Sequence, residues 1–304
     1  MTNYHDPVLL KASVDGLNLK GDDVVVDVTF GGGGHSREII KRLSDKGKLY
    51  GFDQDEDAVK NKLEDERFVL VRHNFRYLKN YLKMYNAIPV DAVLADLGVS
   101  SHQFDEGERG FSIRFDGPLD MRMNVNTKLT AKQVVNEYDD ENLLRIFRAY
   151  GEIKNAWKLV QEIIKARTLV EINTTQELCD VAQACVPGKM RNKYLAQVFQ
   201  ALRIEVNDEM GALRSLLEQC YEVIKPGGRL VVITYHSLED RMVKNFIKNG
   251  KIDGELEKDF YGNPLLKFKA VNRKPIVATE EELQQNNRAR SAKLRIAERL
   301  ENRD

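Results

Sequence analysis

A run of four glycines followed directly by a histidine is the stretch best suited to hold a ligand. Gly31–Gly34 and His35 lie between a β-branched run, Val24–Val28, and a helical pattern. Glycines let a backbone approach a ligand closely, and the first N–H groups of a helix bind anionic groups. The dinucleotide pattern G-x-G-x-x-G is not met, because Ser36 or Arg37 occupies the third position. The loop also lacks the Gly-Lys-Ser/Thr ending of a phosphate-binding loop, so NAD and nucleoside triphosphates are disfavoured, and a purely structural turn is the alternative.

A carboxylate follows the glycines by about twenty residues, at the end of a second apolar run. Lys48–Phe52 predicts a strand, and Asp53 comes directly after it. A carboxylate in this place can accept hydrogen bonds from both hydroxyls of a ribose. The alternative is that Asp53, with the acidic residues 55–57, caps the following helix. A ligand with a nucleoside but no diphosphate is favoured.

A third polar group follows the apolar run Asp91–Leu94, where Asp96 precedes the small and polar residues 97–103. Open α/β sheets bind ligands at the carboxyl ends of their strands, so this segment is the best place for a substrate. An ordinary turn explains it equally well on spacing alone.

The elements that must position these residues alternate between strand and helix. Short β-branched runs and amphipathic stretches in the first hundred residues are typical of a doubly wound parallel sheet. We expect further strands at Phe68–Val71 and, after the turn Lys225–Gly228, at Arg229–Thr234. We also expect an antiparallel pair at Leu265–Val271 and Ala292–Ala297.

A helical stretch interrupts this alternation. Glu106–Met123 is expected to be an ordered loop, and Thr130 with Gln133 has capping-box spacing. One long helix is expected near Tyr194–Ile224. We therefore predict a discontinuous domain of residues 1–106 and 193–304, with an inserted helical domain of residues 107–192.

Composition indicates a globular chain of 304 residues with 42% hydrophobic and 31% charged residues. Lys plus Arg and Asp plus Glu both number 47, so a polyanionic partner must be held by a local basic surface. Three cysteines without CxxC spacing favour a reducing cytoplasm over a disulfide or zinc framework. The first ten residues lack the pattern of a signal peptide, and no apolar run approaches the roughly 20 residues of a membrane span.

Longer motifs resemble one family. They are Asp27–Ser36, Asp96–Ser101, Glu108–Ser112, Asp116–Met123, Phe199–Asn207, His236–Arg241 and Arg288–Arg295. Together they resemble the bacterial small-subunit ribosomal RNA cytosine-N4 methyltransferase family (MraW, also called RsmH), from His5 to Arg299. The resemblance implies a class I fold that binds S-adenosylmethionine, a helical insertion that engages RNA, and transfer of a methyl group to a cytidine in the decoding region of 16S ribosomal RNA.

Carried over by motif, the resemblance implies a set of cofactor-binding residues. Gly33, Gly34 and His35 would line the methionine end, Asp53 the ribose and Phe75 the adenine. Asp96 and Gln103 would complete the site. Many relatives have a larger residue where this chain has Gly32, and we expect the backbone contacts to survive that difference.

The expected reaction is attack by the exocyclic amine of cytosine, whose lone pair is delocalised into the ring. The enzyme must hold the amine in line with the methyl group and accept its hydrogen bonds, which requires neither a metal nor a covalent intermediate. Asp96 and the Ser100–Ser101 turn are our candidates for orienting the amine, with His236 as a second candidate. A histidine satisfied in a loop is an equal alternative for His236. The cysteines fall in predicted helices, and Cys185 precedes Pro187 rather than following it, which disfavours attack by a ring carbon.

Clusters of cations are the candidate RNA contacts, because the target base must leave its stack to reach such a pocket. The candidates are Arg109, Arg114 and Arg122, then Lys189, Arg191 and Lys193, and in the tail Arg288, Arg290, Lys293 and Arg295. A solvated charged face is the alternative for the tail. Two other functions stay open: an RNA-binding assembly factor without turnover, and a methyltransferase of the same fold acting on DNA or a small molecule.

Overall fold

The computed structural model describes residues 7–100, 103–104 and 106–301. They form two compact units, one of residues 1–98 and 211–304 and the other of residues 99–210. Among the described residues, no helix has the length and apolar character needed to cross a membrane.

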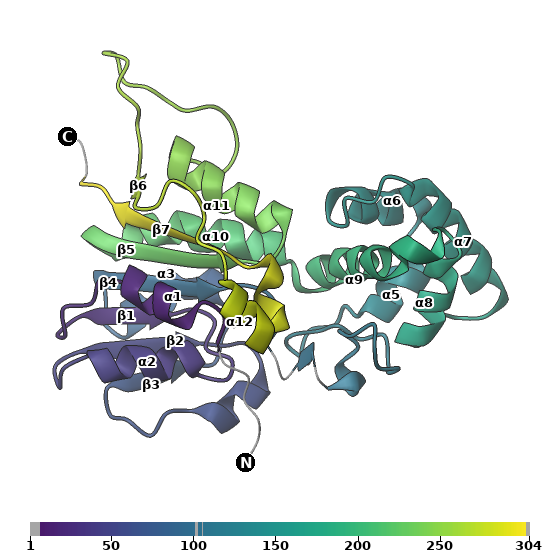
Figure 1. Cartoon of the computed structure of the whole chain (residues 1–304), viewed down its shortest axis with the longest axis horizontal. Helices are drawn as coiled ribbons and strands as arrows, with labels where there is room; N and C mark the ends of the chain where they lie inside the picture. Colours follow the sequence, from purple (N-terminus) through teal and green to yellow (C-terminus); the bar gives the residue numbers. More distant parts are fainter. Residues whose placement is uncertain (1–6, 101–102, 105, 302–304) are drawn as a thin grey trace. The chain divides into compact units, whose positions relative to one another are not determined.

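The first unit contains the sheet (Figure 1). Its elements are α1 (Leu10–Gly16), β1 (Val24–Asp27), α2 (Gly34–Arg42), β2 (Lys48–Phe52), η1 (Glu56–Asn61), β3 (Phe68–Val71), η2 (Phe75–Tyr77), α3 (Leu78–Met84), β4 (Val90–Asp96), α10 (Glu209–Val223), β5 (Ile224–Thr234), α11 (Ser237–Asn249), β6 (Phe268–Ala270), α12 (Glu280–Gln285), η5 (Asn287–Ser291) and β7 (Lys293–Arg299).

The sheet has seven strands in the order β3-β2-β1-β4-β5-β7-β6. The first five strands in this order are parallel to one another, whereas β7 pairs antiparallel with both β5 and β6. The order reverses between β1 and β4, as in other doubly wound sheets, so a ligand site is expected at the carboxyl ends of these strands. The doubly wound α/β sheet and the antiparallel pair at the end of the chain are both confirmed.

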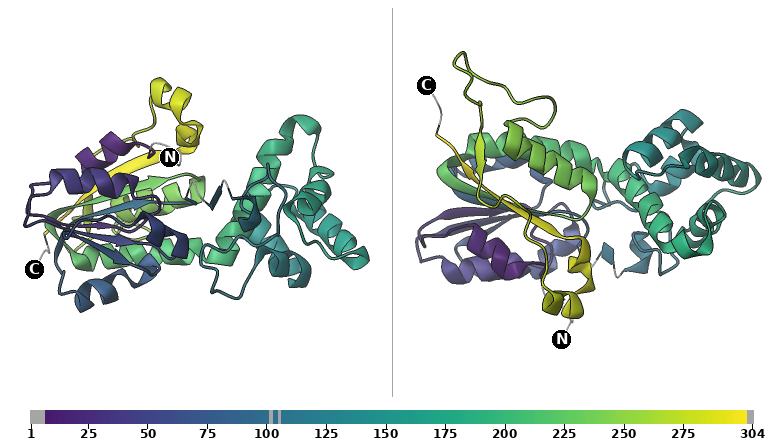
Figure 2. Two further views of the ribbon diagram at one scale, coloured as in Figure 1. Left: turned by 90° about the horizontal axis from the view of Figure 1, so that it is seen from below. Right: turned by 45° about the horizontal axis from the view of Figure 1, so that its top comes forward.

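Helices cover both faces of this sheet. Val14 and Leu17 near α1 and Ile39 of α2 pack on one face, and Leu82 of α3 and Val243 of α11 pack on the other. The left view of Figure 2 shows α1 and α2 on one side of the strands and α3 on the opposite side. The strands are rich in β-branched residues because both of their faces are buried.

The predicted turn Lys225–Gly228 lies within β5. Ile224 pairs with Val90, and pairing resumes only at Arg229 with Ala92. Gly227 has a φ of 77° inside this bulge, a conformation that glycine adopts without steric cost. The turn therefore bends the strand instead of preceding it.

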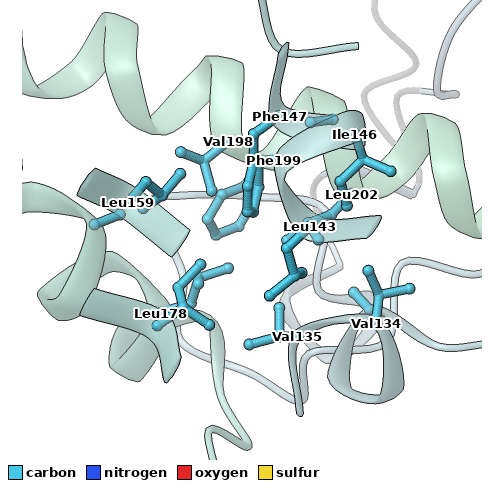
Figure 3. Packing of buried hydrophobic residues seen from close by; sticks show 14 of the residues in the cluster. Val134, Val135, Leu143, Ile146, Phe147, Leu159, Leu178, Val198, Phe199 and Leu202 are labelled. Carbon is cyan, nitrogen blue, oxygen red and sulfur yellow. The ribbon is translucent and has the colours of Figure 1, made fainter. Parts of the chain in front are cut away.

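The second unit is helical. It contains η3 (Gly107–Arg109), α5 (Ala131–Glu137), α6 (Asp140–Ala149), α7 (Ala156–Leu169), α8 (Thr175–Gln183), η4 (Gly188–Met190) and α9 (Arg191–Asn207). The capping box predicted from Thr130 and Gln133 is present. Figure 3 shows side chains of this unit packed into its own core, which contains Leu143, Phe147 and Leu202 among others. The helical stretch thus buries an apolar cluster within itself.

The predicted single helix Tyr194–Ile224 is wrong, because the chain forms two helices there. Asp208 adopts the left-handed conformation with φ 47° and ends α9. Arg203 and Glu209 form a 2.7 Å ion pair across the break. The units divide after Gly98 and after Met210, whereas the sequence pattern placed the borders at 106 and 192. We propose that the inserted domain includes the whole of α9.

Candidate active site

Three carboxylates lie at the carboxyl ends of the neighbouring strands β2, β1 and β4. Asp27 is the last residue of β1 and Asp96 the last of β4, while Asp53 directly follows β2. The Asp27 carboxylate is buried and accepts hydrogen bonds from Ser36 Oγ at 2.7 Å and from the Thr29 backbone at 3.1 Å. Burial raises the pKa of Asp27. The switch point of the sheet therefore concentrates negative charge, which favours a cationic ligand.

Asp53 is held by backbone donors on both carboxylate oxygens. Oδ2 accepts from the Gly31 N–H at 2.7 Å, and Oδ1 accepts from the Asp55 N–H at 2.8 Å. The N-cap of η1 is Asp55, whose side chain accepts from Asp57 N–H, so Asp53 does not cap this helix. Burial raises the pKa of Asp53 to about 6. Each of its oxygens keeps a second acceptor site, which suits the two hydroxyls of a ribose.

The glycine loop is shaped by its neighbours. Gly33 is the N-cap of α2 with φ 74° and supplies no side-chain cap, so the first N–H groups of the helix lack that partner. A Cβ at Gly34 would lie 2.1 Å from Pro7 Cγ. His35 Nε2 lies 3.1 Å from the Val8 carbonyl oxygen. The segment before α1 therefore packs directly against the loop and sets the position of the His35 ring.

Asp96 lies at the centre of a small polar cluster. Its Oδ1 accepts a 2.7 Å hydrogen bond from Tyr235 Oη, and its Oδ2 lies 3.7 Å from His35 Nδ1. The Asp96 N–H donates to Thr29 Oγ1 at 2.6 Å. Burial raises the pKa of Asp96 to about 6, although His35 and Tyr235 oppose this effect. Burial and the Asp96 charge raise the pKa of Tyr235 well above its usual value, so the phenol stays a donor.

His236 is the N-cap of α11. Its side chain accepts from the Glu239 N–H at 3.4 Å, and Glu239 Oε2 accepts from the Tyr235 and His236 N–H groups at 2.8 and 3.3 Å. These contacts complete a capping box. They give His236 a structural role at the start of the helix, next to Tyr235. Its role in catalysis stays a proposal.

Ser100 and Gln103 form two hydrogen bonds with each other. The Ser100 N–H donates to Gln103 Oε1 at 3.1 Å, and the Gln103 N–H donates to Ser100 Oγ at 3.2 Å. Ser101 lies outside the described residues. Phe75 begins η2 after β3 and packs, partly buried, against the core of the first unit, a position from which a ring can border a ligand at that strand end.

Two of the candidate RNA-binding arginines hold their own loop together. Arg122 forms an ion pair with Asp120 at 2.7 Å and donates to the Val125 and Thr127 carbonyls. Arg109 donates to the carbonyl oxygens of residues 122 and 123. The Glu106–Met123 loop is thus ordered as expected, by contacts of these cations.

The other candidates differ in exposure. Lys293 and Arg295 lie on β7 and contact Asp240 at 3.4 and 2.7 Å, and Arg288 of η5 is half-buried. The exposed candidates are Arg114, Lys189, Arg191, Lys193 and Arg290. These five present their charges to solvent, where a polyanion can reach them.

The three cysteine thiols are buried. Cys179 lies in α8 and Cys220 in α10, as expected, whereas Cys185 lies just beyond the end of α8. Burial raises the pKa of Cys179 to about 11 and also raises the pKa values of the other two thiols. A nucleophilic cysteine needs an accessible thiolate, so these thiols are unsuited to attack.

Three members of the cluster were not singled out from the sequence: Asp27, Thr29 and Tyr235. Asp27 opens the glycine-loop motif and ends a strand, which is the same signal that identified Asp53. Tyr235 precedes the motif residue His236 and follows the end of β5, a strand paired with β4. A rule that selects polar residues after every parallel strand finds both of them.

Comparison with known proteins supplies the family. Residues 2–300 match the MraW methylase family. A protein of Flavobacterium johnsoniae named ribosomal RNA small subunit methyltransferase H is 58% identical over 98% of both chains. A protein of the same name from Bacteroides fragilis is also 58% identical over 98% of both chains. The chain belongs to the MraW methylase family.

Proposed function

We propose that this protein transfers the methyl group of S-adenosylmethionine to the exocyclic N4 amine of a cytidine in the decoding region of small-subunit (16S) ribosomal RNA. The observation that carries this proposal is 58% identity over 98% of both chains to relatives named ribosomal RNA small subunit methyltransferase H. Identity of this extent includes both the sheet and the helical unit, so it supports a shared substrate as well as shared chemistry.

The residues at the carboxyl ends of the strands fit the cofactor. Asp53 offers free acceptor sites for ribose hydroxyls, beside a loop where Gly34 leaves no room for a Cβ. Gly33, Gly34 and His35 lie at the start of α2, where N–H groups favour a carboxylate. Phe75 lies at the end of the neighbouring strand, and Gln103 completes the proposed set. When bound, S-adenosylmethionine supplies a methyl group on a positively charged sulfur, which the carboxylates of Asp27, Asp53 and Asp96 favour.

Asp96 is the proposed acceptor for the amine of the target cytosine. Tyr235 donates its hydrogen bond to Oδ1, so Oδ2 is the oxygen proposed to accept a hydrogen bond from an N–H of the amine. Accepting this hydrogen bond turns the nitrogen lone pair out of the ring toward the methyl group. Ser100 and His236 are further candidates for orienting the base. Methyl transfer would form a nitrogen–carbon bond and break the carbon–sulfur bond, whose electron pair would stay on the sulfur. The methylated amine would then lose its extra proton to solvent or to a group of the site.

The acceptor is proposed to be nitrogen rather than ring carbon 5. Methylation at that carbon uses a cysteine nucleophile, and the thiols of Cys179, Cys185 and Cys220 are buried with raised pKa values. Attack by the amine needs positioning and hydrogen-bond acceptors alone. The polar cluster around Asp96 provides an acceptor of this kind.

The RNA is proposed to contact exposed cations, principally Arg114, Arg191, Lys193 and Arg290. Arg109, Arg122 and Arg288 belong to the same basic segments and support their conformation or add further contacts. Phosphate contacts of this kind position the RNA without reading its sequence. Because the proposed substrate, the small ribosomal subunit, is found in the cytoplasm, we propose that the protein acts there.

The test is nucleoside mass spectrometry on unmethylated small ribosomal subunits incubated with the purified protein and S-adenosylmethionine. N4-methylcytidine at one position confirms the reaction, the atom and the substrate together. Cofactor binding by calorimetry without methylated RNA favours the binding-only assembly factor. Methylation of DNA or small amines in competition assays favours a different acceptor.

A further inference from the structure

An open groove of about 470 Å³ lies along η2 and α3 in the first unit. It is lined by His73, Tyr77, Asn80, Tyr81 and Met84, and we call it the α3 groove. Tyr77 is 43% exposed and Met84 is 63% exposed. Large apolar side chains gathered at a concave surface indicate a binding site rather than an ordinary solvated face. None of these residues belongs to the proposed active site.

The rings of the α3 groove are held in place by the core beneath them. His73 contacts Tyr77 edge-on with ring centroids 5.1 Å apart, and its centroid lies 4.9 Å from that of Tyr81. Tyr81 in turn packs edge-on against the buried Phe52 of β2, at 6.2 Å. The exposed rings are thus anchored through Tyr81 to the sheet. A preformed ring surface loses little conformational entropy when a flat ligand stacks on it.

The charge of this segment is positive throughout. Residues 72–89 contain Arg72, Arg76, Lys79 and Lys83 and no acidic residue. Lys79 pairs with Glu222 of α10. Arg72 and Lys83 are exposed, and neither forms an ion pair with a carboxylate among residues 7–100, 103–104 and 106–301. In a chain with zero net charge, this local excess favours a polyanion.

We propose that the α3 groove binds a single-stranded segment of ribosomal RNA. Bases stack on the Tyr77 and His73 rings, and phosphates pair with Arg72 and Lys83. Ring surfaces flanked by cations are the usual means of binding single-stranded nucleic acid. The inference rests on the proposed function, because the RNA that binds the groove is part of the proposed substrate. It adds a contact on the segment that follows β3, the edge strand of the sheet, beyond the cations considered from the sequence.

The test uses the full chain and a fluorescein-labelled single-stranded RNA in anisotropy titrations without methyl donor. Tyr77→Ala removes a stacking ring, and we expect RNA binding to weaken roughly tenfold. Arg72→Glu with Lys83→Glu weakens it further and lowers the slope of log affinity against log salt by about 1.4, from about 0.7 for each lost phosphate contact. Cofactor binding, measured in the same samples, stays unchanged and shows that the variants fold.

Matched controls come from exposed residues elsewhere in the first unit. Tyr261→Ala removes a ring that is 85% exposed, and Lys244→Glu with Lys248→Glu reverses two exposed charges on α11. We expect both controls to bind RNA as the parent does. Equal losses in the controls and in the α3 groove variants overturn the proposal, since they indicate a general charge effect.

Other outcomes are equally decisive. A parent protein without RNA affinity, or α3 groove variants that bind RNA as tightly as the parent, overturn the inference. Self-association in sedimentation that Met84→Asp abolishes, with RNA affinity unchanged, replaces RNA by a second copy as the occupant. A parent that binds RNA through the groove but methylates no cytidine contradicts the proposed function and leaves this inference standing.

Discussion

Tyr235 donates a 2.7 Å hydrogen bond to Asp96 and so joins side chains at the carboxyl ends of two neighbouring parallel strands, β5 and β4. His35 lies 3.7 Å from the other oxygen of the same carboxylate. Asp96 therefore has one oxygen engaged by a donor of high pKa and a second oxygen directed at the start of α2. This arrangement fixes the orientation of the carboxylate that we propose to accept the target amine.

Tyr235→Phe should slow methyl transfer while leaving cofactor affinity within a few-fold of the parent. The variant loses a hydrogen bond to a charged group, which contributes about 1.5–3 kcal/mol. We therefore expect the rate to fall roughly 10- to 100-fold. The measurement is the single-turnover rate of N4-methylcytidine formation.

Tyr138→Phe is the matched control, because it removes a 3.0 Å phenol-to-carboxylate hydrogen bond to Glu205 in the helical unit. We expect its turnover rate to equal that of the parent. A Tyr235→Phe enzyme with unchanged turnover contradicts the proposed role of the Asp96 cluster.

Asp53→Asn should weaken cofactor binding roughly 10- to 100-fold, because a neutral amide accepts less strongly than a carboxylate and presents one acceptor oxygen instead of two. Calorimetric titration with S-adenosylmethionine gives the affinity. Asp57→Asn is the control, since Asp57 forms an ion pair with the nearby Lys60 side chain and lies in the same acidic stretch. Equal affinities of the two variants would remove Asp53 from the site.

Cofactor affinity should rise with pH through about 6. Burial raises the pKa values of Asp53 and Asp96 to about 6 from 3.8, so the folded protein binds more protons than the unfolded chain between these values. The contribution of these two groups to the free energy of unfolding is complete below pH 3.8 and is lost as the pH rises through 6. A cation favours the ionised carboxylates, so its binding near pH 6 releases protons.

Calorimetry in two buffers of different ionisation enthalpy measures this proton release. S-adenosylmethionine should release protons at pH 6 and none at pH 8. S-adenosylhomocysteine, whose sulfur is uncharged, is the control and should release fewer at pH 6. Proton release that is equal for the two ligands excludes the sulfonium charge as its cause.

Gly34→Ala should destabilise the fold by about 1–3 kcal/mol, because a Cβ there would lie 2.1 Å from Pro7 Cγ and force the preceding segment away. Movement of this segment breaks the 3.1 Å contact between His35 and Val8. Cofactor affinity therefore falls together with stability. Thermal unfolding and calorimetry check both effects.

Gly188→Ala serves as the control for this substitution, since a Cβ at Gly188 would have no atom within 4 Å. Its unfolding free energy should change by no more than about 0.5 kcal/mol. If Gly34→Ala is as stable as Gly188→Ala, the position of the glycine loop does not depend on its packing against Pro7.

Features that depend on residues close together in the chain could be predicted from the sequence. The mainly apolar runs Lys48–Phe52 and Phe68–Val71 predicted β2 and β3 to the residue, because a strand in the interior of an α/β domain needs apolar side chains. Thr130 and Gln133 predicted a capping box, since that motif closes within four residues. The carboxylates Asp53 and Asp96 were found because each follows a recognisable strand.

Which of these groups meet, and where the helices end, became known from the three-dimensional structure. The contact of Tyr235 with Asp96 depends on the pairing of β5 with β4, which are separated by more than a hundred residues. The break between α9 and α10 occurs at Asp208, where no glycine or proline marks it. Local sequence patterns reflect the free energy of placing each residue in a helix or a strand. Partners across the sheet and the choice of a left-handed residue depend instead on packing energies between distant segments.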